Sequence, residues 1–195
     1  MLKERLEEII SNTKGVRLSK EKIFDGGFVK VYKEEYKLPD NRVIVKESVS
    51  KNDDKDAAII ITRTIDDRYL VVFQNRVNNI VSAEFPSGYI EKGEDVKTGA
   101  LREVEEETGY SSNEVFLIDT AIPNIGTESS KIHIVYIKNA IKKQNQDLDT
   151  DEFINYELFT FEELKYLLDN KYMQSSGNKL AFYLLKEILA KENDE

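Results

Sequence analysis

The chain has 195 residues, which is enough for one main domain with a small extension. Acidic residues outnumber basic ones by 37 to 28 and give a net charge of −9, so neither a nucleic-acid partner nor binding to a membrane surface is expected. The absence of cysteine excludes disulfides, zinc–thiolate sites and thiol catalysis, and a single histidine leaves carboxylates as the main metal ligands. Carboxylate oxygens select hard cations such as Mg²⁺, Mn²⁺ or Ca²⁺. A charged N-terminus and the lack of an apolar run of ~18 residues predict a cytoplasmic protein.

The N-terminal region is predicted to form a helix followed by a β element. Leucine and isoleucine side chains recur at helical spacing over residues 2–12, which predicts a short amphipathic helix. Residues 28–36 and 42–49 are expected to form strands of a hairpin, joined by a proline-containing turn at 38–41. The polar run 51–56 then separates an N-terminal region, residues 1–50, from a main domain, residues 51–195.

The main domain mixes strands and helices. The runs 57–61 and 69–73 are almost continuously apolar, which is typical of strands buried on both faces. A helix over 94–108 is expected to end at Gly109, and Thr160 with Glu163 forms a capping box that opens a helix to about residue 168. Further strands are predicted at 115–122, 132–137 and 153–159, and a last helix at 179–191. Strands first and helices last predict an α+β or mixed α/β sandwich.

The helix predicted over 94–108 carries three glutamates on one face. At about 100° per residue, Glu103, Glu106 and Glu107 share an arc of about 100°, whereas Glu105 points elsewhere. Like charges at this spacing and negative charge in a last turn both destabilise a helix, which favours a bound cation. A solvated acidic surface helix is the alternative.

The residues that flank this helix favour the metal site. Gly88 gives a tight loop whose backbone can approach an ion. Glu94 and Arg102 carry opposite charges and can tie that loop to the helix.

Residues 88–110 match the Nudix box at every specified position: glycine, five residues, glutamate, seven residues, then Arg-Glu-apolar-any-Glu-Glu-any-Gly-apolar. The chain therefore resembles the Nudix hydrolases. The resemblance implies an α/β/α sandwich with a mixed sheet, and an enzyme that binds Mg²⁺ or Mn²⁺ and hydrolyses nucleoside-diphosphate-linked substrates. It also implies that Glu103, Glu106 and Glu107 are metal ligands together with the backbone of Ser87, and that Glu103 and Arg102 belong to the catalytic machinery, Arg102 by holding the loop through Glu94.

Segments outside the box resemble the ADP-ribose pyrophosphatase group of this family. They include 28–32 with 38–42, 73–76, 84–88, Pro123 and 149–153. This resemblance implies that ADP-ribose is cleaved to AMP and ribose 5-phosphate. Phe73 stands where the group has an arginine, so hydrolysis of another nucleoside diphosphate derivative is an alternative. A nucleotide-sugar sensor without turnover is an alternative of a different class, which the complete set of box glutamates disfavours.

Four further residues have predicted roles. Arg76 and Glu84 are expected to bind substrate, Arg76 through a phosphate, although an ion pair would also explain the arginine. Phe28 either stacks on a base or packs in a strand core. Glu128 lies in the loop 123–130 and is predicted to orient or deprotonate water, with an exposed turn residue as the alternative.

The N-terminal β element predicts the quaternary structure. An isolated hairpin is marginal in water and needs a surface to pack against. The segment also resembles one that crosses between subunits in the ADP-ribose group. We therefore expect a homodimer whose partners are a second copy and a small-molecule nucleotide substrate.

Overall fold

A computed structural model describes residues 1–150 and 152–194, except for the side chains of residues 78, 193 and 194. Asp151, in the predicted segment 149–153, and Glu195 lie outside the described residues. The chain divides into two compact units. The first comprises Met1–Asp54 and Asn124–Ser130, and the second Lys55–Pro123 and Lys131–Glu195.

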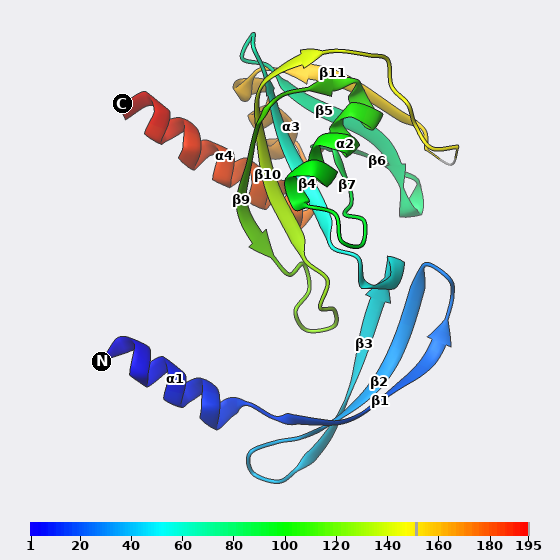
Figure 1. Cartoon of the computed structure of the whole chain (residues 1–195), viewed down its shortest axis with the longest axis vertical. Helices are drawn as coiled ribbons and strands as arrows, with labels where there is room; N and C mark the ends of the chain where they lie inside the picture. The colour runs from blue at the N-terminus through cyan, green and yellow to red at the C-terminus, as the bar shows by residue number, and fades with distance from the viewer. Residues whose placement is uncertain (151, 195) are drawn as a thin grey trace. The chain divides into compact units, whose positions relative to one another are not determined.

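The first unit consists of a helix and a three-stranded antiparallel sheet in the order β1-β2-β3 (Figure 1). Its elements are α1 (Leu2–Thr13), β1 (Val16–Asp25), β2 (Val29–Lys37), β3 (Val43–Lys51) and the 3-10 turn η1 (Asn52–Asp54). The predicted helix and hairpin are confirmed, but β1 is missing from the prediction. All ten residues of β1 are exposed and many are charged, so the segment lacks the alternation that identifies a half-buried strand.

The second unit is built on a mixed sheet of eight strands with the order β11-β5-β4-β10-β8, while β6 pairs with β5, β7 with β4 and β9 with β10. Strand β10 runs parallel to β4, and the other pairings are antiparallel. The strands are β4 (Ala57–Thr64), β5 (Tyr69–Arg76), β6 (Ile80–Glu84), β7 (Ser87–Tyr89), β8 (Tyr110–Ser111), β9 (Glu114–Ala121), β10 (Ile132–Lys142) and β11 (Ile154–Phe159); the 3-10 turn η2 (Val77–Asn79) joins β5 to β6.

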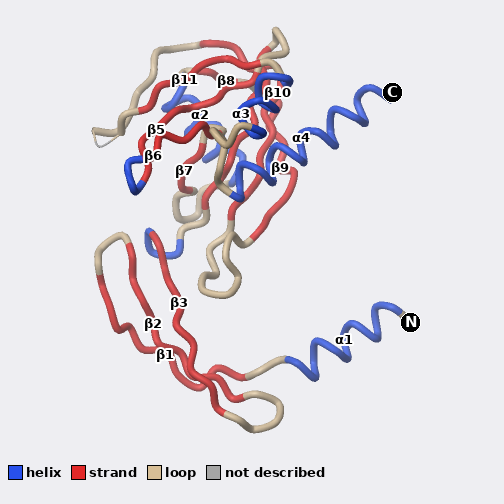
Figure 2. The backbone as a smooth tube through the Cα atoms, turned by 180° about the vertical axis from the view of Figure 1, so that it is seen from behind, coloured by secondary structure: helices blue, strands red, loops and turns tan. Residues whose placement is uncertain are grey.

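Helices cover both faces of this sheet (Figure 2). They are α2 (Val96–Thr108), α3 (Phe161–Asp169) and α4 (Ser176–Asp194). Side chains of α3 and α4 share a buried cluster with Ile59 and Ile61 of β4, and α2 shares another with Ala58 and Ile60. Strand β4 is therefore buried on both faces, as its apolar run predicts. The α+β sandwich is confirmed.

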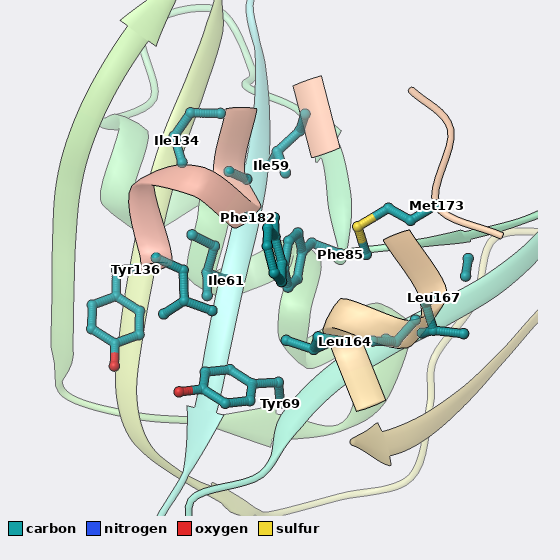
Figure 3. Packing of buried hydrophobic residues seen from close by; sticks show 14 residues of the cluster. Ile59, Ile61, Tyr69, Phe85, Ile134, Tyr136, Leu164, Leu167, Met173 and Phe182 are labelled. Atoms are coloured by element: carbon teal, nitrogen blue, oxygen red, sulfur yellow. The ribbon is translucent and has the colours of Figure 1, made fainter. Parts of the chain in front are cut away.

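The larger cluster fixes α3 and α4 against the sheet. Figure 3 shows Phe182 of α4 packed with Phe85 and Ile61, near Leu164 of α3. Phe182 also stacks on Phe161, with 5.4 Å between ring centroids. The capping box predicted for α3 is present, since Thr160 Oγ1 accepts the Glu163 amide at 3.2 Å and Glu163 Oε2 accepts the Thr160 amide at 2.7 Å.

Some boundaries differ from the prediction. Helix α2 begins at Val96 because Asp95 is its N-cap and accepts the amides of Lys97 and Thr98 at 3.0 and 3.2 Å. Strands β6, β7 and β8 were not predicted, because segments of two to five residues are too short to show a period. None of the helices within the described part of the chain is long and apolar enough to cross a membrane.

Candidate active site

The predicted metal-binding face of α2 meets β7, the strand that precedes it; Gly88, predicted to give a tight loop, is the middle residue of this strand and pairs with Ala58 of β4. Glu107 is 2% exposed, and its Oε2 accepts a 3.1 Å hydrogen bond from the backbone amide of Ser87. The carboxyl group of Glu103 lies against Gly88 so closely that a Cβ atom at Gly88 would be 2.0 Å from it. Residues at the two ends of the box motif are thus brought together in space, and Gly88 is required by close approach.

Arg102 links the loop to the helix, as the resemblance implies. Its Nε and Nη2 each lie 3.1 Å from an oxygen of Glu94, and Nη2 also donates to the backbone carbonyl of Tyr89 at 3.0 Å. Its Nη1 lies 2.8 Å from Glu103 and 3.0 Å from Glu106. One guanidinium therefore neutralises part of the carboxylate cluster and fixes the loop.

Burial shifts the protonation of the glutamates. Burial raises the pKa of Glu107 well above its ordinary value, and the Ser87 amide only partly opposes this. Burial also raises the pKa of Glu103 despite the nearby Arg102. By contrast, the hydrogen bonds from Arg102 lower the pKa of Glu94. A cation beside Glu103 and Glu107 would offset the cost of ionising them.

The donor set fits a hard divalent cation. It offers only oxygen atoms, and Glu107 is a buried carboxylate aimed at the backbone of β7. Within residues 1–150 and 152–194, however, no three acidic or histidine side chains form a ready-made cation cluster. Arg102 pairs with Glu103 and Glu106 instead, and these two carboxylates would have to turn from the guanidinium to contact a cation.

Arg76 and Glu84 form a bidentate ion pair. Nε of Arg76 lies 3.0 Å from Glu84 Oε1 and Nη2 lies 2.5 Å from Oε2. Glu84 is 5% exposed, whereas the Arg76 side chain is 45% exposed. The positive charge of Arg76 also lowers the pKa of Glu107. The ion pair considered for Arg76 is therefore present, and it leaves the arginine partly accessible beside the box.

Phe73 occupies the position of the missing arginine. Its ring packs on Phe159 at 6.0 Å between centroids, and it contacts the cluster beneath α3 and α4. Because side chains alternate along a strand, Phe73 and Arg76 lie on opposite faces of β5. Phe73 therefore stands in place of an arginine on the face of the sheet that α3 and α4 cover, and not on the face that carries Arg76.

Two predicted site residues belong to the first unit. The Glu128 side chain is 5% exposed, and its carboxylate pairs with Lys51 Nζ at 2.9 Å. The exposed turn considered as an alternative for Glu128 is therefore wrong. Phe28 lies in the turn between β1 and β2 and is 54% exposed, so the strand-core interpretation of this ring is wrong as well.

Two residues near the box were not predicted. The charge of Glu152 raises the pKa of both Glu103 and Glu107, which places a further carboxylate within electrostatic reach of them. Lys142 Nζ donates to the carbonyl of Thr108 at the end of α2, at 2.6 Å. The cation that compensates this helix end therefore comes from β10 and not from α2 itself. Neither contact has a local sequence signal, because both cross from other segments.

Comparison with known proteins agrees with this geometry. A family model described as the NUDIX domain matches residues 53–179. A Bacillus subtilis protein named ADP-ribose pyrophosphatase is 29% identical over 178 residues, which cover 88% of this chain and 94% of that protein. A Bacillus methanolicus protein named methanol dehydrogenase activator is 33% identical over 170 residues, 85% of this chain and 89% of that protein.

A solved structure described as an ADP compounds hydrolase has the same fold. Its TM-score is 0.82 at 22% identity, and the match covers 92% of this chain and 96% of that one. The mixed sheet and the glutamate-bearing helix thus define a Nudix hydrolase fold. The chain belongs to the NUDIX family. The predicted family, and its resemblance to ADP-ribose pyrophosphatases, are confirmed.

Proposed function

We propose that the protein hydrolyses the diphosphate bond of a nucleoside diphosphate sugar with the help of a divalent metal ion. ADP-ribose is the substrate that the relatives favour, with AMP and ribose 5-phosphate as products. The observation that carries the proposal is the buried carboxylate of Glu107 against the Ser87 amide, on the same face of α2 as Glu103.

Each residue of the site has a proposed role. Glu103, Glu106 and Glu107 hold Mg²⁺ or Mn²⁺ together with the backbone of Ser87. The bound ion offsets diphosphate charge and makes water more acidic. Arg102 keeps the loop on the helix through Glu94. Arg76, kept in place by Glu84, presents its exposed edge to a phosphate.

Glu128 is our proposed general base. Its pairing with Lys51 holds the carboxylate in one place within the first unit. The backbone supports the same loop, because the Val49 amide donates to the Thr127 carbonyl at 2.7 Å. Glu152 is the rival candidate for this role, since its charge reaches Glu103 and Glu107.

The first unit is proposed to form a homodimer. In its sheet and in the turn between β1 and β2, seven apolar side chains are each 50% or more accessible: Val16, Leu18, Ile23, Phe24, Phe28, Val43 and Val45. Apolar surface of this extent around a three-stranded sheet favours burial against a second copy.

A cytoplasmic location, where nucleotides are available, also stays a prediction.

A turnover screen tests the proposed function. ADP-ribose, other nucleoside diphosphate sugars, dinucleotides and NADH would each be incubated with the protein and Mg²⁺, and the products identified by mass. AMP and ribose 5-phosphate from ADP-ribose, in preference to the other substrates, is the expected result. Faster hydrolysis of another diphosphate would replace ADP-ribose as substrate. Binding without any product would support the sensor alternative.

A further inference from the structure

The carbonyl groups at the end of α2 are all hydrogen-bonded. The last four carbonyls of an α-helix have no partner within the helix itself. In α2 the first of them, on Glu105, accepts the amide of the Gly109 cap at 2.8 Å. The other three carbonyls accept hydrogen bonds from one distant segment. The Asp147 amide donates to the Glu106 carbonyl at 2.9 Å. Gln146 Nε2 donates to the Glu107 carbonyl at 2.7 Å, and Lys142 Nζ donates to the Thr108 carbonyl at 2.6 Å.

This segment, residues 142–147, is called the clamp segment here. It passes very close to the helix end, because the Gly109 carbonyl accepts the amides of Lys143 and Gln144 at 2.9 and 3.2 Å. A Cβ atom at Gly109 would lie 2.0 Å from the Gln144 carbonyl oxygen. Gly109 is thus required both by its φ of +73° and by the approach of the clamp segment.

Lys142 supplies the cation at the negative end of the helix dipole. Its ammonium lies 4.7 Å from the ring centroid of Tyr156 and 5.4 Å from that of Tyr110, and it donates to the Tyr156 hydroxyl at 2.5 Å. A positive charge at a helix C-terminus stabilises the helix. It therefore compensates part of the negative charge that Glu106 and Glu107 add to the last turn.

Gln146 makes the most specific of these contacts. Its Nε2 donates to the carbonyl of Glu107 at 2.7 Å and to that of Ile154 at 3.1 Å. Both acceptors are carbonyl oxygens, so the amide nitrogen must face them, and its two N–H groups are both used. One side chain thus joins the backbone of a predicted metal ligand to the first residue of β11, two residues beyond Glu152.

We propose that Gln146 is a positioning residue that holds the Glu106–Glu107 turn in the geometry that binds the divalent ion. The inference rests on the proposed function, in which these glutamates are metal ligands. A helix end whose carbonyls lack partners frays, and a frayed last turn would let both carboxylates leave their positions. Groups that orient the ligands of a metal commonly change its affinity by about 10- to 100-fold when they are removed.

Binding of Mn²⁺ without substrate tests this inference. Gln146→Leu removes both donors, and Gln144→Leu is the matched control, because the exposed Gln144 contacts α2 through its backbone amide. Calorimetry on the full chain should show Mn²⁺ bound about 10-fold more weakly by Gln146→Leu and unchanged by Gln144→Leu. Gln146→Lys, whose ammonium can donate to both carbonyls, should recover most of the affinity.

A purely structural role would lower the melting temperature of Gln146→Leu while its Mn²⁺ affinity matched the control, and this result would overturn the proposal. If Gln146→Leu does not fold, Gln146→Asn, one methylene shorter, takes its place in the same comparison. Lack of turnover of every diphosphate in the substrate screen would refute the proposed function alone, because the Mn²⁺ comparison is made without substrate.

Discussion

The backbone amide of Ser87 donates a 3.1 Å hydrogen bond to Oε2 of Glu107, twenty residues further along the chain. This contact joins β7, the strand before α2, to the last turn of that helix. Because Glu107 is 2% exposed, its charge has little help from water and depends on the groups around it. Under the proposed function, the backbone of β7 and the last turn of α2 would hold the divalent ion together.

Replacing Glu128 by glutamine tests the proposed base. A positioned general base contributes about 10²–10⁴-fold to a rate, so Glu128→Gln should lower kcat by that order with little change in Mn²⁺ affinity. Steady-state kinetics at saturating Mg²⁺ measures the first quantity and calorimetry the second. Lys51→Gln should lower kcat less, because the carboxylate that it pairs with is retained.

Glu152→Gln is the contrasting variant. If Glu128→Gln keeps more than about half of the wild-type kcat, Glu128 is not the base. A large loss of kcat in Glu152→Gln would then assign the role of general base to Glu152. If Glu152→Gln also keeps its kcat, Glu103 is the next choice for the base.

The exposed apolar residues of the first unit predict a homodimer in solution. Light scattering at micromolar concentration should give twice the mass of the chain. Val45→Lys places a charge at a side chain that is 54% exposed, and it should shift the protein toward monomer. A wild-type monomer with full activity would contradict the proposed dimer.

Glu34 predicts a pH dependence of stability in the first unit. Its side chain is 6% exposed. Burial alone would raise its pKa, but hydrogen bonds from Ser48, Tyr36 and Arg17 outweigh burial and lower the pKa to about 2. Because the folded pKa lies below the unfolded value, the stabilisation is complete above about pH 4.5 and is lost as the pH falls toward 2.

The loss amounts to about 3 kcal/mol in the free energy of unfolding. Urea unfolding followed by circular dichroism over this pH range should show a shallower pH dependence for Glu34→Gln than for the wild type. Glu47→Gln, at an exposed position on β3, is the control and should follow the wild type. Equal slopes for Glu34→Gln and the wild type would refute the assignment.

Features with a local cause could be predicted from the sequence. The end of α2 at Gly109 and the capping box of Thr160 with Glu163 depend on residues a few positions apart, so a short stretch of sequence contains the whole signal. The carboxylate face of α2 was predictable for the same reason, because helical periodicity alone determines which glutamates share it.

Features that depend on distant segments could not be predicted. Strand β1 is fully exposed and is defined only by its pairing with β2. Gln146 and Lys142 reach the end of α2 from 34 to 39 residues away, and nothing in their immediate surroundings marks them. The role of Glu152 could not be predicted either, because only the folded chain brings its charge near the box.

Glu107→Gln tests most directly whether the glutamate face of α2 carries metal-dependent hydrolysis. Glu105→Gln is the matched control, because it removes the same charge from the same helix on another face. With ADP-ribose and Mg²⁺, we expect Glu105→Gln to keep wild-type kcat and Glu107→Gln to lose at least about 100-fold, in line with the removal of a group that acts in the transition state. Without metal, the melting temperature of Glu107→Gln should hold or rise, because burial of an ionised carboxylate is relieved. Equal turnover by the two variants at limiting Mg²⁺ would contradict the account.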